Sequence, residues 1–188
     1  MKNELPENAK MVFRGEIFEV WQWEQKMFDG TIEIFEKIKR ADTVDVVAAV
    51  GNKIILTEQE QPHHGPFFAI PGGRNDKNEE PLSAAKRELL EETGYESSDW
   101  ELFRERRPFG SIIWSSYTFI ARDCRLVKDP SPDAGEKIKT LLVSFDEFIE
   151  ISQKPDFRDK EFAQYLLRTK FDEKFREDLK VKLFVNEK

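Results

Sequence analysis

Residues 11–40 alternate between apolar and polar side chains, which is the pattern of β-strands. This alternation runs through residues 11–25, stops at the turn Phe28-Asp29-Gly30 and resumes along residues 31–40. An Asp-Gly pair between two such runs is a strong signal for a β-hairpin. We therefore predict that residues 11–40 form short strands joined by a hairpin turn.

Runs rich in β-branched residues follow. Residues 43–50 and 53–59 flank a Gly51-Asn52 turn and predict a second hairpin, and residues 66–70 predict another strand. Later in the chain we predict three more strands, at residues 100–109, 111–124 and 138–145. A loop rich in Pro, Asp and Gly, residues 129–137, precedes the last of them.

Helices are predicted in two parts of the chain. Residues 82–93 are mostly good helix formers, Pro81 suits a first helical turn, and Gly94 supplies a left-handed stop. The other helical segments come at the end of the chain, at residues 145–152, 160–171 and 173–184. Strands that flank a central helix, with helices at the end, predict an α/β (α+β) fold in which a mixed β-sheet is sandwiched between helices.

Composition and charge limit the kind of protein. The 188 residues include 39% hydrophobic side chains and sixteen Phe, enough for a sizeable core. Cys124 is the only cysteine, so we expect no disulfide within the chain and a reducing compartment. The polar first ten residues and the lack of long apolar runs predict a cytoplasmic protein with no membrane contact. A net charge of −7 argues against a nucleic-acid partner.

The predicted helix 82–93 carries an unusual group of acidic residues. Glu88, Glu91 and Glu92 are three or four positions apart and share one face of the helix. We expect apolar residues of another face to be buried, namely Leu82, Ala85 and Leu89. Three adjacent carboxylates repel each other, and a hard divalent cation removes that repulsion. The alternative is a solvated, charge-rich helix in a chain that is 36% charged.

The offsets of these residues favour the metal-binding interpretation. The chain reads G-x5-E-x7-R-E-L-L-E-E-x-G, with these letters at Gly73, Glu79, Arg87, Glu88, Leu89, Leu90, Glu91, Glu92 and Gly94. This spacing resembles the Nudix box and departs from it only at Tyr95, where a small aliphatic residue is usual. The resemblance implies a metal-dependent hydrolase of nucleoside diphosphate derivatives.

Further segments resemble the ADP-ribose pyrophosphatase branch of the Nudix family, from about Val12 to Leu167. They are residues 13–20, the hairpin at 28–30, and residues 35–40, 56–59 and 135–148. In that branch, a small N-terminal antiparallel β extension packs across a homodimer and helps to form the partner's nucleotide pocket. The resemblance therefore implies a dimerisation element at residues 1–42 and a hydrolase domain at residues 43–188.

The resemblance also assigns roles in the chemistry. Mg²⁺, with Mn²⁺ as a substitute, would be held by a backbone carbonyl and three carboxylates, those of Gly72, Glu88, Glu91 and Glu92. Arg87 would hold the glutamates in place, and Glu79 would fix the junction between loop and helix. The general base would be Glu136, with Asp133 as the nearby alternative; a box glutamate such as Glu91 would serve if neither does.

The small-molecule nucleotide is assigned in the same way to residues 35–40. Phe35 would stack on the base, with Phe18 as a weaker candidate, and Glu36 and Arg40 would contact the base and a phosphate. The phase of Phe35, opposite to that of the neighbouring isoleucines, favours a pocket role over a core one. Gln61 stands where an arginine commonly contacts phosphate, and it lacks that charge. Pro108 lies near a marker proline of the branch, and Trp114 follows it in a predicted strand.

Three functions remain open at this point. The first is an Mg²⁺-dependent pyrophosphohydrolase of ADP-ribose or a related nucleoside diphosphate sugar. The second is a hydrolase of nucleoside triphosphates or dinucleoside polyphosphates, which would share the box and differ in the pocket. The third is a non-catalytic nucleotide-binding module, although such modules typically lose box glutamates that are all present here.

Overall fold

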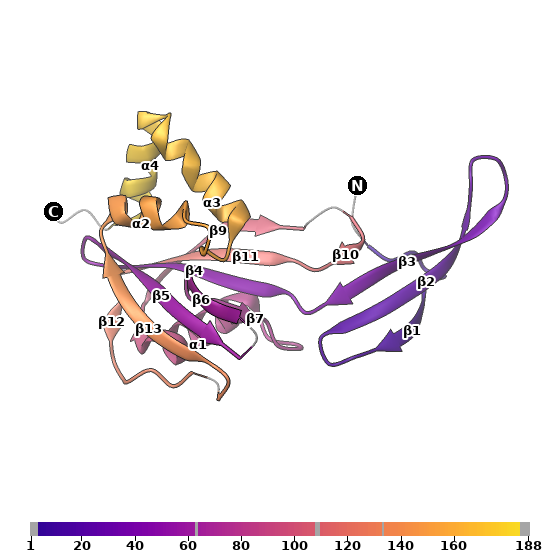
Figure 1. Cartoon of the computed structure of the whole chain (residues 1–188), viewed down its shortest axis with the longest axis horizontal. Helices are drawn as coiled ribbons and strands as arrows, with labels where there is room; N and C mark the ends of the chain where they lie inside the picture. Colours follow the sequence, from indigo (N-terminus) through magenta and orange to yellow (C-terminus); the bar gives the residue numbers. More distant parts are fainter. Residues whose placement is uncertain (1–3, 63, 108–109, 133, 185–188) are drawn as a thin grey trace.

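Three N-terminal strands and one strand from later in the chain form a separate four-stranded sheet that projects from the rest of the molecule (Figure 1). The computed structural model describes residues 4–62, 64–107, 110–132 and 134–184. The projecting sheet has the order β1-β2-β3-β10, with bounds Lys10–Arg14, Phe18–Lys26, Ile32–Arg40 and Ile112–Ile113. Asp29 accepts hydrogen bonds from the Thr31 backbone and hydroxyl and closes the β2–β3 hairpin at the predicted position.

A seven-stranded mixed sheet forms the centre of the molecule. Its main path is β13-β5-β4-β11-β9, with β6 on β5 and β7 on β4; the bounds are Thr43–Val50 (β4), Lys53–Gln61 (β5), His64–Ala69 (β6), Gly72–Arg74 (β7), Asp99–Arg106 (β9), Ser116–Arg122 (β11) and Lys137–Val143 (β13). Strands β4 and β11 run parallel, whereas the other pairs are antiparallel. A two-stranded ladder joins β8 (Tyr95–Glu96) to β12 (Arg125–Leu126).

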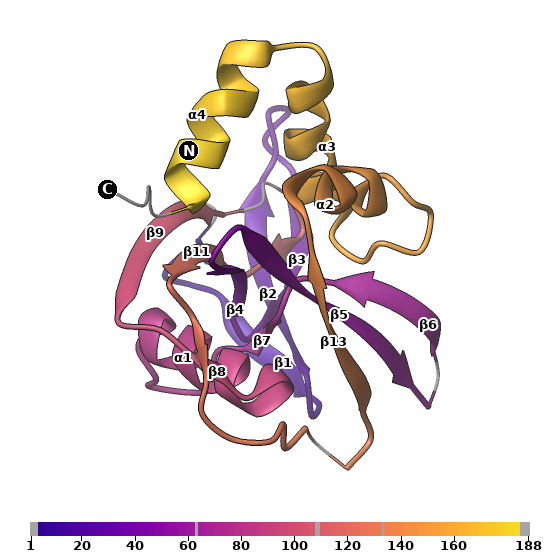
Figure 2. The ribbon, with the colours of Figure 1, turned by 90° about the vertical axis from the view of Figure 1, so that its left-hand side faces the viewer.

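Helices cover both faces of this sheet (Figure 1, Figure 2). Helix α1 (Pro81–Thr93) packs on one face, in a cluster that includes Ala85 and Leu89. The other face carries α2 (Phe145–Ser152), α3 (Lys160–Leu167), the 3₁₀ turn Arg168–Lys170 and α4 (Glu173–Leu183). The predicted mixed sheet between helices is confirmed.

Two parallel connections join the projecting sheet to the central one. Strand β3 leads into β4, and β10 leads into β11. Strands β3 and β10 lie side by side in the projecting sheet, and β4 and β11 lie side by side in the central sheet. Across the junction, Thr43 N donates to Ser115 O at 2.9 Å, and Ser115 N donates to the Asp42 carboxylate at 2.6 Å. The junction is therefore held by backbone and side-chain bonds as well as by the covalent chain.

The structure departs from the sequence-based expectation in a few places. Leu82 was expected to be buried on α1 and is 36% exposed; Ala84 lies in the core instead. The strand expected over residues 111–124 is split into β10 and β11, and the short strand β7 was not foreseen. Pro108 lies outside the described residues. Within the described part of the chain, no helix is both long and apolar enough to cross a membrane.

Candidate active site

Helix α1 presents its acidic face to the loop that precedes it because its two ends are fixed. Pro81 occupies the first turn, and Gly94 ends the helix in the left-handed conformation at φ 76°, with its N–H bonded to Leu90 O. Ala85 and Leu89 anchor the opposite face in the core. Glu88, the partly exposed Glu91 and the buried Glu92 are thereby held on the side of the site.

Two glycines let the backbone of β7 approach its neighbours closely. A Cβ atom at Gly72 would lie 2.3 Å from the Val44 carbonyl oxygen, and one at Gly73 would lie 2.5 Å from Glu88 Oε1. Real Cβ atoms do not approach this closely, so a side chain at either position would displace the strand or the carboxylate. The glycines therefore bring the loop backbone against the carboxylates of α1.

Arg87 ties the acidic residues of the box together. Its guanidinium bonds both carboxylate oxygens of Glu79, Glu88 Oε1 at 2.8 Å, Glu91 Oε2 at 3.2 Å and the Arg74 carbonyl oxygen. The pKa of Arg87 is raised, mainly by the Glu79 bonds and secondarily by Glu88. Glu79 also accepts a bond from Asp76 N and so ties the loop to the helix. The positive charge of Arg87 is thus used within the protein.

Glu92 is held differently, by two neutral donors. Gln59 Nε2 donates to its Oε1 at 3.1 Å, and Gly72 N donates to its Oε2 at 3.0 Å. Burial raises the pKa of Glu92 to about 8; the Gly72 N–H opposes this, and the charges of Glu88 and Glu136 add to it. Burial also raises the pKa of Glu88, against the effect of Arg87.

These carboxylates suit a divalent cation by their chemistry. Hard cations prefer oxygen ligands, and burial and the neighbouring carboxylates raise the pKa values of Glu88 and Glu92, an effect that a bound cation would oppose. In the present arrangement the carboxylates face Arg87, Gln59 and Gly72, and no three acidic, His or Cys side chains of the described residues converge as a ready metal cage. Arg87 bonds only one oxygen of Glu88 and one oxygen of Glu91.

Glu136 lies next to this cluster although it comes from a distant loop. Its charge raises the pKa values of Glu88 and Glu92. Gln61 Nε2, at the end of β5, donates to Glu136 Oε1 at 3.2 Å. Gln61 is therefore bonded to the candidate base in this structure. The alternative base Asp133 lies outside the described residues.

The residues assigned to the nucleotide do not gather at one place within the chain. Arg40 and Phe18 line a cleft of about 690 Å³ between the projecting sheet and the box loop Asn75–Glu79. Arg40 lies 6.0 Å from the Trp114 ring, and its buried Nε has no hydrogen-bond partner among the described residues. Phe35 and Glu36 do not line this cleft.

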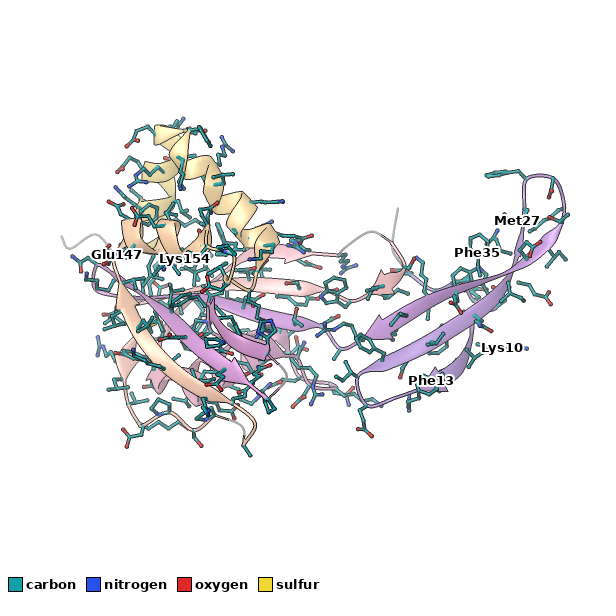
Figure 3. The ribbon with its side chains drawn as sticks, viewed as in Figure 1. Lys10, Phe13, Met27, Phe35, Glu147 and Lys154 are labelled. Atoms are coloured by element: carbon teal, nitrogen blue, oxygen red, sulfur yellow. The ribbon has the colours of Figure 1, made fainter. Side chains whose placement is uncertain are left out.

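Phe35 and Glu36 lie instead on the projecting sheet. Phe35 packs against Trp23 at 6.0 Å between ring centroids, and Glu36 accepts a bond from Gln22. Figure 3 shows Phe35 well away from the central sheet and its box helix. Within one copy of the chain, these two residues are therefore separated from the carboxylates of α1.

Two further residues of the site escaped the sequence analysis. Gln59 is 1% exposed and binds Glu92, and its signal is a glutamine two positions after Thr57 on the buried face of β5. Asp45 lies in β4 directly opposite Gly72. Burial of its carboxyl group raises the pKa of Asp45 to about 7, although the residue as a whole is only partly buried; Asp159 adds to the shift, and Arg158 and Arg106 oppose it.

Comparisons with known proteins agree with this geometry. The model of the NUDIX domain matches residues 39–166. The ADP-ribose pyrophosphatase of Bacillus subtilis (strain 168) is 25% identical over 166 residues, which cover 84% of this chain and 89% of that protein. The Methanol dehydrogenase activator of Bacillus methanolicus is 32% identical over 95 residues, 50% of this chain and only about half (51%) of that protein.

A solved structure shares the fold. It is described as the crystal structure of an ADP compounds hydrolase and superposes with a TM-score of 0.71 at 21% identity, covering 87% of this chain and 91% of the other. At this level of identity, the likeness concerns the arrangement of strands and helices.

Proposed function

This chain belongs to the NUDIX domain family and is a pyrophosphohydrolase, and we propose that it cleaves the diphosphate bond of ADP-ribose or a related nucleoside diphosphate sugar. The products would be a nucleoside monophosphate and a sugar phosphate. The observation that carries the proposal is the complete set of box carboxylates on α1, adjacent to the loop carboxylate Glu136.

Nudix hydrolases generally use a divalent metal, and we propose Mg²⁺, with Mn²⁺ as a substitute. Glu88, Glu91, Glu92 and the Gly72 carbonyl would hold it. When bound, the metal would activate water and neutralise charge on the phosphate oxygens. The donor set, all oxygen and short of positive charge, supports this assignment.

The side chains of the protein would then divide the remaining work. Arg87 restrains Glu88 and Glu91 through its fork of N–H groups, and Gly72 and Gln59 fix the two oxygens of Glu92. Glu136 would take the proton of the attacking water. Gln61 orients the carboxylate of Glu136 through its amide, so its side chain acts on the base rather than on a phosphate.

The choice of a nucleoside diphosphate sugar rests on the cleft beside the box loop and on the similarity to known proteins. The similarity to the Bacillus subtilis ADP-ribose pyrophosphatase extends over 84% of this chain. The 690 Å³ cleft lies directly beside the box loop and offers Arg40 as a cation and Phe18 and Trp21 as stacking surfaces. These features fit a nucleotide whose diphosphate reaches the carboxylates of α1.

We propose that residues 1–42 form a dimerisation element and that residues 43–188 form the hydrolase domain. The distance of Phe35 and Glu36 from their own box helix supports a role in the pocket of a second copy. The projecting sheet also exposes many apolar side chains, which a partner would cover; they include Met11, Val12, Phe13, Ile32, Ile34 and Phe35.

Release of nucleoside monophosphate tests the proposed substrate. The panel would contain ADP-ribose, other nucleoside diphosphate sugars, dinucleoside polyphosphates and nucleoside triphosphates, each with Mg²⁺ and with chelator. Metal-dependent cleavage concentrated on ADP-ribose or another nucleotide sugar is the expected result. Preference for triphosphates or dinucleotides would overturn the substrate assignment and retain the box chemistry. Tight nucleotide binding without any cleavage would identify a binding module.

A further inference from the structure

A second cavity, of about 380 Å³, lies between the β5–β6 hairpin and the segment that joins α2 to α3. Gln61 lines it and also binds Glu136, so the cavity adjoins the candidate base. Its other polar side chains are those of His64, Asp156, Arg158 and Lys160, and the ring of Phe67 forms part of its wall. This cavity is distinct from the cleft beside the box loop, with which it shares no lining residue.

The backbone that carries Arg158 is fixed to the sheet. Phe68 N donates to Asp156 O at 2.9 Å, and Arg158 N donates to Phe68 O at 2.8 Å. Phe157, between them, is completely buried in the core. The position of the Arg158 backbone is thus set by strand β6 and the core, so its guanidinium projects from a rigid base.

Arg158 has no acidic partner among the described residues. No carboxylate there forms an ion pair with it, and its guanidinium carbon lies 5.9 Å from the centre of the Phe67 ring. Arg158 lines the same cavity as Gln61, which donates to Glu136, so the cavity that holds the guanidinium adjoins the candidate base.

Other cations near the site have partners. Arg87 is shared among three glutamates, and Lys160 Nζ donates to the carbonyl oxygens of Pro155 and Lys154, which holds the loop closed. Arg106 pairs with Glu161. Strand β5 contributes only the neutral Gln61 to the lining of this cavity, and the amide of Gln61 donates to Glu136. Arg158 can therefore add positive charge for a dianionic diphosphate to that of the metal and of Arg40 in the other cleft.

We propose that Arg158 binds phosphate oxygens of the substrate's diphosphate. The second cavity then receives the phosphate-bearing group that lies across the diphosphate from the nucleoside. The planar guanidinium suits two oxygens of one phosphate, and the wall formed by Phe67 limits its hydration. The identity of the substrate as a nucleoside diphosphate sugar rests on the proposed function; the phosphate contact of Arg158 does not.

The test uses Arg158→Ala, Arg158→Lys and, as the matched control, Lys154→Ala. Lys154 belongs to the same segment and lies over the Phe68 ring, but it does not line the cavity. Binding of methylenediphosphonate, a diphosphate that cannot be hydrolysed, is measured by calorimetry with Mg²⁺ at fixed concentration. We expect binding to weaken roughly 10- to 100-fold in Arg158→Ala, which corresponds to one charged hydrogen-bonding partner. Arg158→Lys should recover only part of the loss, and Lys154→Ala should match the wild type.

The second readout is the KM for whichever substrate of the panel is cleaved, which should rise more than kcat falls in Arg158→Ala. Equal methylenediphosphonate affinity in wild type and Arg158→Ala, or no measurable binding by the wild type, would overturn the inference. The two proposals fail separately. Cleavage of nucleotide sugars with an unchanged KM in Arg158→Ala would retain the function and remove the role of Arg158. Arg158-dependent diphosphonate binding without such cleavage would do the reverse.

Discussion

Gln59 and Glu92, which are 33 positions apart in the chain, meet in the interior through a hydrogen bond of 3.1 Å from Nε2 to Oε1. Glu92 is 3% exposed and Gln59 1%, so neither has water as a substitute partner. Neutral donors orient Glu92, so no cation of the described residues pairs with its carboxyl group, whereas Glu88 and Glu91 share the charge of Arg87. The site therefore separates the positioning of Glu92 from the neutralisation of its charge.

Replacing Gln59 with leucine should weaken metal binding. The substitution removes the donor that fixes one oxygen of Glu92 while keeping a side chain of similar size. Residues that orient metal ligands typically contribute 10- to 100-fold to affinity, and we expect a loss of about that size for Mg²⁺ in Gln59→Leu. Calorimetric titration of the metal-free protein with Mg²⁺ measures it.

Thr57→Val is the control for that experiment. Thr57 accepts the other Gln59 N–H at 3.0 Å and donates to Ala69 O, so the change disturbs the same buried network without touching Glu92. It should reduce thermal stability and leave the Mg²⁺ affinity nearly unchanged. Equal losses of affinity in the two variants would show that Gln59 acts only on the general stability of the site.

Protons should compete with the metal between pH 4.5 and about 8. The pKa of Glu92 is raised by burial to about 8, so the folded metal-free protein keeps a proton there that the unfolded chain has lost above pH 4.5. The folded state then binds more protons, and its stability falls as the pH rises through this window. Asp45, with a pKa raised to about 7, changes stability in the same direction.

Thermal melts between pH 5 and pH 9 measure this dependence. We expect the melting temperature of the metal-free protein to fall toward pH 8, Mg²⁺ to stabilise it more at pH 8 than at pH 6, and metal binding to release protons. Glu92→Gln should flatten the pH dependence in part, since Asp45 remains. An unchanged slope in Glu92→Gln would show that Glu92 is already ionised in the folded protein.

Glu136→Gln should slow turnover strongly and leave metal binding nearly unchanged. A general base contributes about 10²- to 10⁴-fold to the rate, and a loss in this range is expected in kcat. Glu60→Gln is the matched control, because Glu60 is close in sequence to Gln61 and pairs with Lys137 at the surface. A normal rate in Glu136→Gln would remove Glu136 as the base.

The effect of Arg87 should depend on Glu79. Arg87→Lys cannot keep both bonds to Glu79 together with those to Glu88 and Glu91, so the variant should lose activity and some stability. Once Glu79 is changed to Gln, part of that network is already lost. A double-mutant cycle on kcat should therefore show losses that are smaller than the product of the single effects, and independent effects would contradict the network.

Local patterns in the sequence were sufficient for the helix and its acidic face. Pro81 and Gly94 mark the ends of α1 within one residue of the prediction, and the Asp29-Gly30 pair lies in the β2–β3 turn. These features depend on neighbours in the chain, which the sequence displays directly. The spacing of the box glutamates is likewise local, because one helical turn brings them together.

Contacts between distant segments could not be predicted in this way. Gln59 meets Glu92 because β5 packs beside α1, and Arg158 shares a cavity with Gln61 because the α2–α3 segment packs beside the β5–β6 hairpin. Leu82 was placed in the core by its helical phase, but that phase does not show where the edge of the buried face lies. Pairings across the sheet decide these details, and their partners lie tens of residues away.

Charge on the projecting sheet should separate the two copies of a homodimer. Ile34 is 62% exposed and Phe13 60%, and a buried interface would not tolerate an unpaired carboxylate at either position. We expect Ile34→Glu and Phe13→Glu to shift the protein from dimer to monomer in size-exclusion chromatography with light scattering. Phe171→Glu is the control, because Phe171 is 84% exposed and lies next to α4, outside the projecting sheet.

Mixed dimers can show whether Phe35 serves the partner's pocket. Glu92→Gln would inactivate its own carboxylate cluster, and Phe35→Ala would damage the pocket of the other copy. If the two residues act across the dimer, each site of a mixed dimer takes Phe35 from one copy and Glu92 from the other. One site then holds both natural residues, so activity returns on mixing two inactive variants. If Phe35 and Glu92 act within the same copy, every site of the mixed dimer carries one lesion and the mixture stays inactive.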